Sequence, residues 1–307
     1  MVDRVVGETQ RAARVFLYYR TYWGQGTTMQ WSGKNILARN KEELINVCMK
    51  SADLPRHDIH SYACVDRSTP QFSAWLRERF SEVFETNEGS DGNDFADGLP
   101  VYGGRGSSYK MFEFMEANRH RDDDIILVLE DDYLFVSGGF DEWVNACAHF
   151  DGFVSPFDHP DRYIRNDDSG GGATKVDVYN RRHWRTAEST TCTSGARYKF
   201  FRKTFFIRRL PRVHVSSLWP GRFIGRELPS IDRVFYRRIK WLHGIRLFTP
   251  IPGIASHLAK YAPPRRSRYL KPGCPIPSTQ LSPGVDWEKR YAEVLRTVET
   301  SVARAAL

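Results

Sequence analysis

Three consecutive acidic residues follow a short apolar run near the middle of the chain. Glu130, Asp131 and Asp132 come directly after Ile125–Leu129, and an unbroken apolar run of this length is typical of a buried parallel strand. In open α/β sheets, residues that follow such a strand lie at the carboxyl edge, where ligands bind. Carboxylate oxygens there suit Mg²⁺ or Mn²⁺, which readily bridge to phosphates. We therefore expect a divalent cation and a phosphorylated ligand at this edge.

The alternative for these acids is a solvated turn, which is a reasonable interpretation of Asp122–Asp124 just upstream. Apolar residues flank Glu130–Asp132 on both sides, and this makes a solvated turn less favoured at the second acidic run.

Strands and helices alternate over the first 130 residues or so and predict a doubly wound, mostly parallel sheet flanked by helices. The predicted strands are 15–19, 61–65 and 125–129. The predicted helices are 41–50, 71–84 and one capped by Ser107 or Ser108. In the second half we expect a strand over 198–207, a helix starting at 229–230, an irregular basic loop over 263–271 and a final helix over 287–306.

The order of these motifs resembles that of GT-A fold glycosyltransferases, closest in pattern to the inverting family 2-type nucleotide-sugar transferases. The resemblance covers about residues 14–260, and Glu130–Asp132 is similar to the EDD variant of the family's DxD metal motif. It implies that Asp132 contacts Mn²⁺ or Mg²⁺, and that Glu130 and Asp131 serve the ribose or a metal-bound water. It also implies a nucleotide-diphosphate sugar donor, most simply a UDP-sugar.

Further positions are assigned by the same resemblance. Tyr18 and Arg20 match the segment that packs on the donor's nucleobase, and Asp66 matches an aspartate that contacts the base or ribose. The loop at 103–110 offers Arg105 and Lys110 to the nucleotide. His257 lies where related enzymes place a histidine that completes metal or pyrophosphate binding.

Inverting transfer needs a general base that accepts the proton of the acceptor hydroxyl. The resemblance implies that this base lies at a helix start after the acceptor-side strand, and residues 227–238 are similar to that region, so Asp232 is the first choice, Glu227 the second and Glu188 the third. An aspartate in the first turn of a helix is also favoured by the helix dipole, so Asp232 has a purely structural alternative.

Charge is distributed unevenly along the chain. Residues 1–132 hold 16 Lys or Arg and 22 Asp or Glu, a balance of −6. Since the net charge of the whole chain is +8, the remaining residues carry a balance of +14. This favours an anionic acceptor. One candidate is hydroxymethylated pyrimidine in DNA, whose target base would be flipped out; an envelope glycan or a lipid-linked acceptor at a membrane surface is the alternative.

Two other classes of protein fit less well. A nucleotidyltransferase would carry a glycine-rich signature directly after its first strand, where this chain has Tyr18–Tyr22. A non-catalytic nucleic-acid-binding protein would explain the basic half but not Glu130–Asp132.

The remaining expectations concern organisation and compartment. We expect one domain with a nucleotide-sugar half at 1–135, an acceptor half at 136–260, and a basic loop and helix at 261–307. The five cysteines lack CxxC spacing, which argues against a disulfide framework or a zinc site. No secretory signal and no transmembrane run are found in the sequence, so we expect a cytoplasmic protein.

Overall fold

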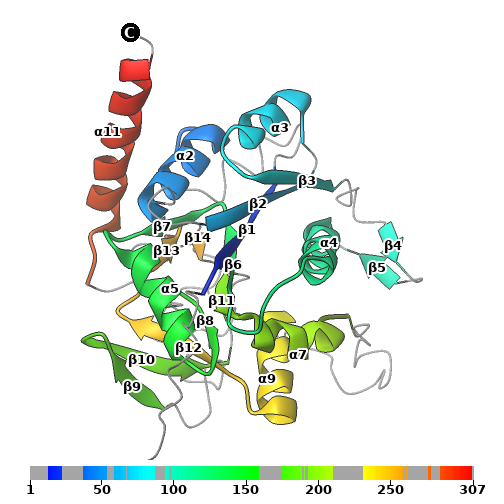
Figure 1. Ribbon diagram of the computed structural model, residues 1–307. Coiled ribbons are helices and arrows are strands. Elements are labelled where there is room, and N and C mark those ends of the chain that lie inside the picture. Colours follow the sequence, from blue (N-terminus) through cyan, green and yellow to red (C-terminus); the bar gives the residue numbers. More distant parts are fainter. Residues whose placement is uncertain are drawn as a thin grey trace, which may run out of the picture.

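The computed structural model describes residues 13–22, 37–53, 59–66, 68–86, 94–96, 99–101, 103–158, 175–188, 190, 193–209, 231–258, 260–261, 276–277 and 284–305. A nine-stranded sheet runs through the molecule in the order β3-β2-β1-β6-β11-β8-β12-β10-β9 (Figure 1). These strands are β1 (Val15–Tyr22), β2 (Ile59–Asp66), β3 (Glu82–Thr86), β6 (Ile125–Glu130), β8 (Gly152–Val154), β9 (Val176–Tyr179), β10 (Arg182–Ala187), β11 (Ser194–Arg197) and β12 (Arg246–Ile251).

Short strands lie outside the main sheet in three pairs, which are β7 (Tyr133–Phe135) with β13 (Ala255–His257), β14 (Lys260–Tyr261) with β15 (Ile276–Pro277), and β4 (Asp94–Ala96) with β5 (Leu99–Val101). The helices are α2 (Lys41–Ala52), α3 (Pro70–Arg77), α4 (Gly103–Ala117), α5 (Gly139–His149), α7 (Tyr198–Arg209), α9 (Ile231–His243) and α11 (Trp287–Ala305).

The first part of the sheet is parallel, as the alternation of strands and helices predicts. β3, β2, β1 and β6 run in the same direction, so their carboxyl ends meet at one edge. β11 then runs antiparallel between β6 and β8, β12 is parallel to β8, and β10 and β9 add an antiparallel end. The predicted fold class, a mostly parallel α/β sheet flanked by helices, is confirmed.

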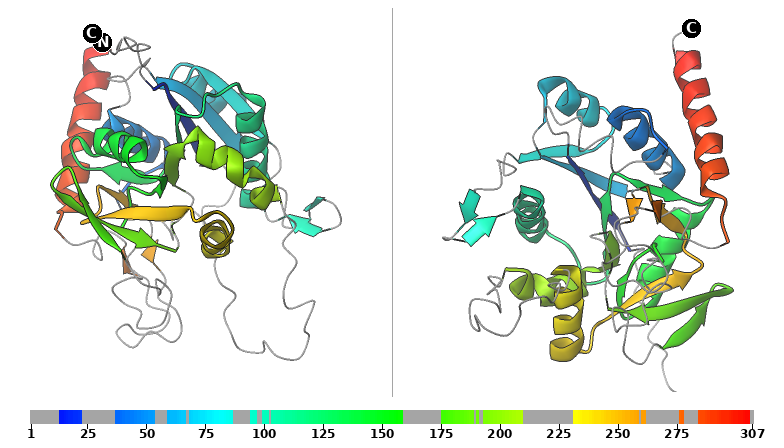
Figure 2. Two further views of the ribbon diagram at one scale, coloured as in Figure 1. Left: turned by 60° about the horizontal axis from the view of Figure 1, so that its bottom comes forward. Right: turned by 180° about the vertical axis from the view of Figure 1, so that it is seen from behind.

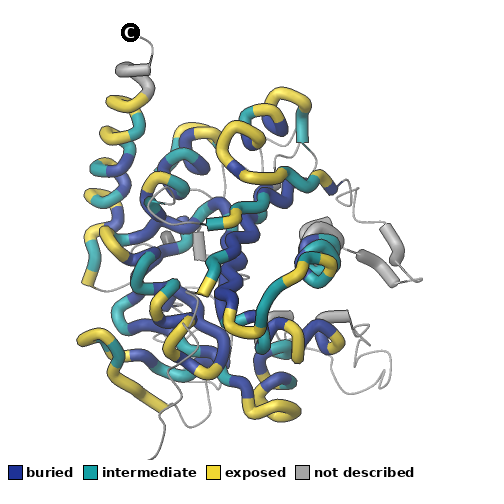
Figure 3. Tube along the Cα trace, viewed as in Figure 1, coloured by how far each residue is buried: buried dark blue, intermediate teal, exposed yellow. Residues whose placement is uncertain are grey.

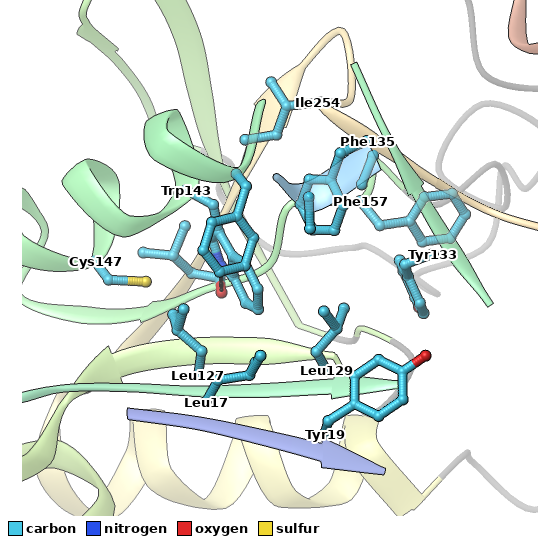
Figure 4. Close-up of a cluster of buried hydrophobic side chains, with 14 of the residues drawn as sticks. Leu17, Tyr19, Leu127, Leu129, Tyr133, Phe135, Trp143, Cys147, Phe157 and Ile254 are labelled. Carbon is cyan, nitrogen blue, oxygen red and sulfur yellow. Dashed lines mark hydrogen bonds between the residues drawn. The ribbon is translucent and has the colours of Figure 1, made fainter. Parts of the chain in front are cut away.

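Strand alternation divides the buried side chains between the two faces of the sheet. Leu17, Leu127 and Leu129 face one core, in which α5 contributes Trp143 (Figure 4); α2 and α3 complete this layer. The other face carries its own core, to which α4, α7 and α9 contribute Met111, Phe201 and Ile239. Figure 2 shows these helices on opposite sides of the sheet, and Figure 3 shows the central strands as mostly buried and the strand at the far end as exposed.

The C-terminal helix belongs to a third, smaller core. Trp287, Tyr291 and Val294 of α11 pack against Leu44 and Val47 of α2. The Tyr291 hydroxyl donates to Glu43 at 2.7 Å, so this helix supports the beginning of α2, which lies beside the acidic run.

Two predicted elements are wrong in part. Residues 198–207 form helix α7, not a strand, because the buried Phe201, Thr204 and Phe205 follow a helical spacing that the aromatic composition obscures. Helix α3 ends at Arg77, not at residue 84, and residues 82–86 instead form β3, which pairs with β2. α4 also starts at Gly103, before the predicted serine caps.

The upstream acids are not all solvated. Asp124 is fully buried, and its carboxylate accepts hydrogen bonds from the Arg14 side chain and from the backbone N–H of Arg121 at 2.7 Å. Burial alone would raise the pKa of Asp124, but the hydrogen bonds from Arg14 and Arg121 outweigh it and lower the pKa below its usual value. This carboxylate anchors the start of β6.

Candidate functional site

The acidic run occupies the predicted place at the sheet edge. Glu130 is the last residue of β6, and Asp131 and Asp132 form the link to β7. In the parallel register Arg20 of β1 lies opposite Glu130, and Tyr22 of β1 lies opposite Asp66 of β2. Arg20, Asp66 and the three acids are therefore brought to one edge by neighbouring strands.

Glu130 is matched by a cation from the adjacent strand. The Arg20 guanidinium lies 3.0 Å from a carboxylate oxygen of Glu130, and both side chains are largely buried. The backbone N–H of Glu130 donates to the Thr193 hydroxyl at 3.1 Å. These two contacts hold Glu130 between the end of β1 and the residue that precedes β11.

Asp131 is held by two different elements. One of its carboxylate oxygens accepts a hydrogen bond from the Thr21 hydroxyl and also contacts the ammonium group of Lys41. Lys41 is the first residue of α2, which is capped by the Asn40 side chain. Asp131 is only 7% exposed, and these contacts turn it toward β1 and α2.

The two carboxylate oxygens of Asp132 have different surroundings. Its Oδ2 lies 2.8 Å from Nε2 of His257, whereas its Oδ1 is buried and has no hydrogen-bond partner among the described residues. A buried carboxylate oxygen without a partner is costly. This oxygen is thus suited to an incoming donor or cation.

Backbone pairing sets the position of His257. β13 runs antiparallel to β7, with His257 opposite Tyr133, and the N–H of Leu258 donates to the carbonyl of Asp132 at 2.7 Å. The imidazole stacks on the Tyr133 ring with centroids 5.1 Å apart.

The Asp132–His257 pair is electrostatically coupled. Burial opposes the charged form of each group, but their mutual attraction outweighs it, with a further contribution at Asp132 from Lys41. The pKa of Asp132 is therefore lowered and the pKa of His257 is raised. This coupling favours a carboxylate facing an imidazolium in the absence of any other cation.

The donor set fits a divalent cation in part. Asp132 and His257 offer a carboxylate and an imidazole, both of which Mn²⁺ accepts. The Oδ1 atom of Asp132 has no partner in the part of the chain that the structure describes, so the carboxylate can accept a further ligand. Within the described residues no three His, Cys, Asp or Glu side chains are grouped as a metal site. Such a site would depend on the substrate's phosphates and water for its remaining ligands, as is usual for Mg²⁺.

Among the predicted nucleotide-binding residues, the structure places Tyr18, Lys110 and part of Arg105. Tyr18 is within β1, not at its end, and its buried hydroxyl hydrogen-bonds with His120 at 2.9 Å and Asn118 at 3.2 Å. It is a core residue because strand alternation points it to the face opposite Tyr19. Lys110 lies on α4 beside Glu113 at 3.3 Å, and Arg105 lies near the start of α4, with its side chain outside the described residues.

Two of the three candidate bases lie among the described residues. Asp232 lies in the first turn of α9, as predicted, although its side chain is outside the described residues, and Glu227 is outside them altogether. Glu188 follows β10 where β12 begins, because Ala187 pairs with Leu247. Its carboxylate contacts Arg237 at 2.7 Å and Lys240 at 3.4 Å.

Sequence reasoning missed several residues of the site. Lys41 and Thr21 belong to no recognisable sequence motif. The only signal for Lys41 is that it begins a helix after β1, and a helix that follows a strand starts near the carboxyl edge of the sheet. The Tyr19 hydroxyl is buried without a partner among the described residues, and burial and the nearby Asp131 raise its pKa. Asp158, just after β8, is fully buried and forms an ion pair with Arg185.

No described helix combines the length and apolar character needed to cross a membrane. No family model matches the sequence, and no curated protein matches it.

Several solved structures are similar to the chain. An active-site mutant of LgtC matches with a TM-score of 0.41 and 11% identity over 92% of this chain and 95% of that chain. A structure of the galactosyltransferase LgtC in complex with donor and acceptor sugar analogs matches with a TM-score of 0.39 and 12% identity over 92% of this chain and 95% of that chain. The glycosyltransferase GlyE of Streptococcus pneumoniae TIGR4 matches with a TM-score of 0.36 and 10% identity over 95% of this chain and 64% of that chain.

A nucleotidyltransferase is similar to about the same degree. The inositol-1-phosphate CTP transferase from T. maritima has a TM-score of 0.40 and 13% identity over 92% of this chain and 96% of that chain. Glycosyltransferases and a nucleotidyltransferase are thus both among the similar structures, at TM-scores of 0.36 to 0.41.

Proposed function

We propose that the chain is a metal-dependent glycosyltransferase that moves a sugar from a nucleotide-diphosphate donor, most simply a UDP-sugar, to an acceptor hydroxyl. The observation that carries this proposal is the buried Oδ1 of Asp132, which has no hydrogen-bond partner among the described residues and lies beside His257 at the carboxyl edge of the parallel strands. Ligands of open α/β sheets bind at this edge.

The three acids have different roles in this proposal. Arg20 neutralises Glu130, and Lys41 with Thr21 holds Asp131. Asp132, together with His257, is the acid proposed to lie toward the diphosphate of the donor. When bound there, Mn²⁺ or Mg²⁺ supplies Lewis-acid neutralisation of the leaving diphosphate. Asp66, buried at the end of β2, is the proposed contact for the base or ribose, and it lies at the same sheet edge as Arg20 and Glu130.

The proposed base is Asp232 on α9, with Glu227 as the alternative, and the proposed outcome is inversion at the anomeric carbon. Glu188 is a weaker choice, because it leaves the sheet at the beginning of β12 and already contacts Arg237 and Lys240. If Asp232→Asn turns over at close to the wild-type rate, Glu227 becomes the proposed general base.

An anionic acceptor remains part of the proposal, but the structure weakens its simplest form. Many of the cations that suggested a polyanion already contact acids, as in Arg182–Glu142, Arg185–Asp158, Arg197–Asp151, Arg202–Asp122 and Arg237–Glu188. Hydroxymethylated DNA is therefore one acceptor to test, beside envelope glycans and lipid-linked sugars.

The test is release of the nucleoside diphosphate from a panel of nucleotide sugars, with and without Mn²⁺. We expect Mn²⁺-dependent release from one donor by the wild type, and its loss in Asp132→Asn with folding retained. Asp123→Asn is the matched control, because Asp123 is an exposed acid just before the same strand. A folded wild-type protein that releases no nucleoside diphosphate but shifts DNA would instead be a nucleic-acid-binding protein.

A further inference from the structure

The surface of α7 and α9 carries exposed apolar side chains that packing does not explain. Phe206 is 71% exposed, Trp241 is 83% exposed and Leu242 is 49% exposed. Both helices already bury another face against the sheet, since Phe201 of α7 and Ile239 of α9 are fully buried in the same core. The exposed residues are therefore additional to the apolar surface that holds the helices in place.

Each of these side chains follows a basic stretch on the same helix. On α7, Arg202 and Lys203 precede Phe206 by about one turn, and all three are exposed. On α9, Arg237 precedes Trp241 by one turn, and Lys240 is its exposed neighbour. The two helices lie next to each other in both views of Figure 2, and they share one core.

The charge of the helix pair is strongly positive. The two segments Tyr198–Arg209 and Ile231–His243 contain nine Lys or Arg and one acid, Asp232. Acids from other elements lie against some of these cations, namely Asp151 on Lys199, Asp122 on Arg202 and Glu188 on Arg237 and Lys240. Counting these three acids, the balance is 9 − 1 − 3 = +5.

We infer that the α7–α9 surface binds an anionic lipid bilayer. Tryptophan is enriched at the boundary between lipid headgroups and acyl chains, and leucine and phenylalanine bury apolar surface when they enter the acyl layer. The cations add attraction to acidic headgroups, which falls off within a Debye length. The protein would bind at the membrane surface through these helices without crossing the membrane.

Nucleic acid is the competing partner for a basic surface with an aromatic ring. Its binding depends mainly on phosphate contacts, with stacking of bases on aromatic rings. An exposed leucine beside the tryptophan adds nothing to either interaction, whereas it adds directly to insertion in lipid. The combination of Trp241 and Leu242 thus favours the bilayer.

The test is sedimentation of the full chain with vesicles of phosphatidylglycerol and phosphatidylcholine, compared with phosphatidylcholine alone. We expect binding to the anionic vesicles that weakens as salt is added. Trp241→Ser/Leu242→Ser should lose at least about tenfold in partitioning, since two apolar side chains leave the bilayer. Lys203→Gln/Lys240→Gln should bind more weakly at low salt and approach the wild type at high salt.

A matched control is available on β9 at the end of the sheet. Val176 and Val178 are 58% and 62% exposed, so Val176→Ser/Val178→Ser removes similar exposed apolar groups away from α7 and α9. We expect this variant to bind vesicles like the wild type. Quenching by brominated lipid should also be smaller in Trp241→Phe than in the wild type.

The inference is overturned if the wild type does not bind anionic vesicles, or if the Trp241/Leu242 and Val176/Val178 variants lose binding equally. It is also overturned if the protein binds duplex DNA but not vesicles, and if the Trp241→Ser/Leu242→Ser variant still binds the DNA. None of these outcomes depends on sugar transfer, so the proposed activity is tested separately.

Discussion

Replacing Lys41 with methionine tests how the acidic run is held. The Lys41 side chain is 19% exposed and that of Asp131 is 10% exposed, so the pair is mostly buried, and Thr21 is the second group that contacts the same carboxylate oxygen. Removing one partner of a fully buried ion pair costs about 3–5 kcal/mol. Because water still reaches Lys41, we expect Lys41→Met to lower the free energy of unfolding by about 2–3 kcal/mol.

A double-mutant cycle separates this pair from its surroundings. Asp131→Asn alone leaves the ammonium of Lys41 without its carboxylate, whereas Lys41→Met/Asp131→Asn removes both charges and keeps similar shapes. The double variant should therefore be more stable than the sum of the single changes implies, by at least about 1 kcal/mol. Urea unfolding followed by circular dichroism measures all of these variants.

Lys110→Met is the matched control for this cycle. Lys110 is 43% exposed and its contact with Glu113 is a surface pair on one helix, so its loss should change stability by no more than about 0.5 kcal/mol. The reasoning fails if Lys41→Met is no more destabilising than Lys110→Met, or if the Lys41 and Asp131 changes are additive.

Three further predictions concern the framework of the site. Asp124→Ala should destabilise the fold by about 1–3 kcal/mol because the hydrogen bonds of a buried carboxylate with Arg14 and with the backbone N–H of Arg121 are lost, whereas the exposed Asp123→Ala should cost under about 0.5 kcal/mol; equal denaturation midpoints would contradict this. Burial lowers the pKa of His120 to about 4, below about 6.5 for an unfolded histidine, so the unfolded chain takes up the proton first as pH falls. The contribution of His120 to the free energy of unfolding is fully present above about pH 6.5 and should decline between about pH 6.5 and 4 by at most about 1.4 kcal/mol per pH unit. His120→Gln should reduce this dependence on pH; an unchanged dependence would refute the lowered pKa of His120. Gly195→Ala should cost about 1–3 kcal/mol, because an added Cβ would lie 2.6 Å from Leu127 Cδ2 and 2.7 Å from Cys147 Sγ; thermal unfolding at the wild-type temperature would count against this packing.

The sequence predicted those parts of the fold whose local pattern agrees with the tertiary structure. The continuous apolar run before Glu130 predicted β6 because that strand is buried on both faces. The aromatic residues of 198–207 misled the prediction, since their local preference for strands competes with the helical spacing of the residues that the sheet core buries. The end of α3 was missed because pairing with β2, a tertiary contact, converts 82–86 to a strand.

The site was predictable to the extent that it follows from strand ends. Asp66, Glu130 and Arg20 share one sheet edge because each lies at or near the end of a parallel strand, and His257 contacts Asp132; their roles toward a nucleotide or a metal stay predictions. The contacts of Lys41 and Thr21 with Asp131 could not be predicted, because they join three elements through side-chain geometry. Tyr18 was assigned to the nucleotide from its position in the sequence, whereas strand alternation buries it beside His120.

Calorimetry of UDP binding in the presence and absence of Mn²⁺ tests the central assignment most directly. We predict that wild-type protein and Asp123→Asn bind UDP with Mn²⁺ and lose at least about tenfold in affinity without it, and that folded Asp132→Asn gains nothing from the metal. Mn²⁺-dependent UDP binding by Asp132→Asn at the wild-type affinity would contradict the role given to this carboxylate.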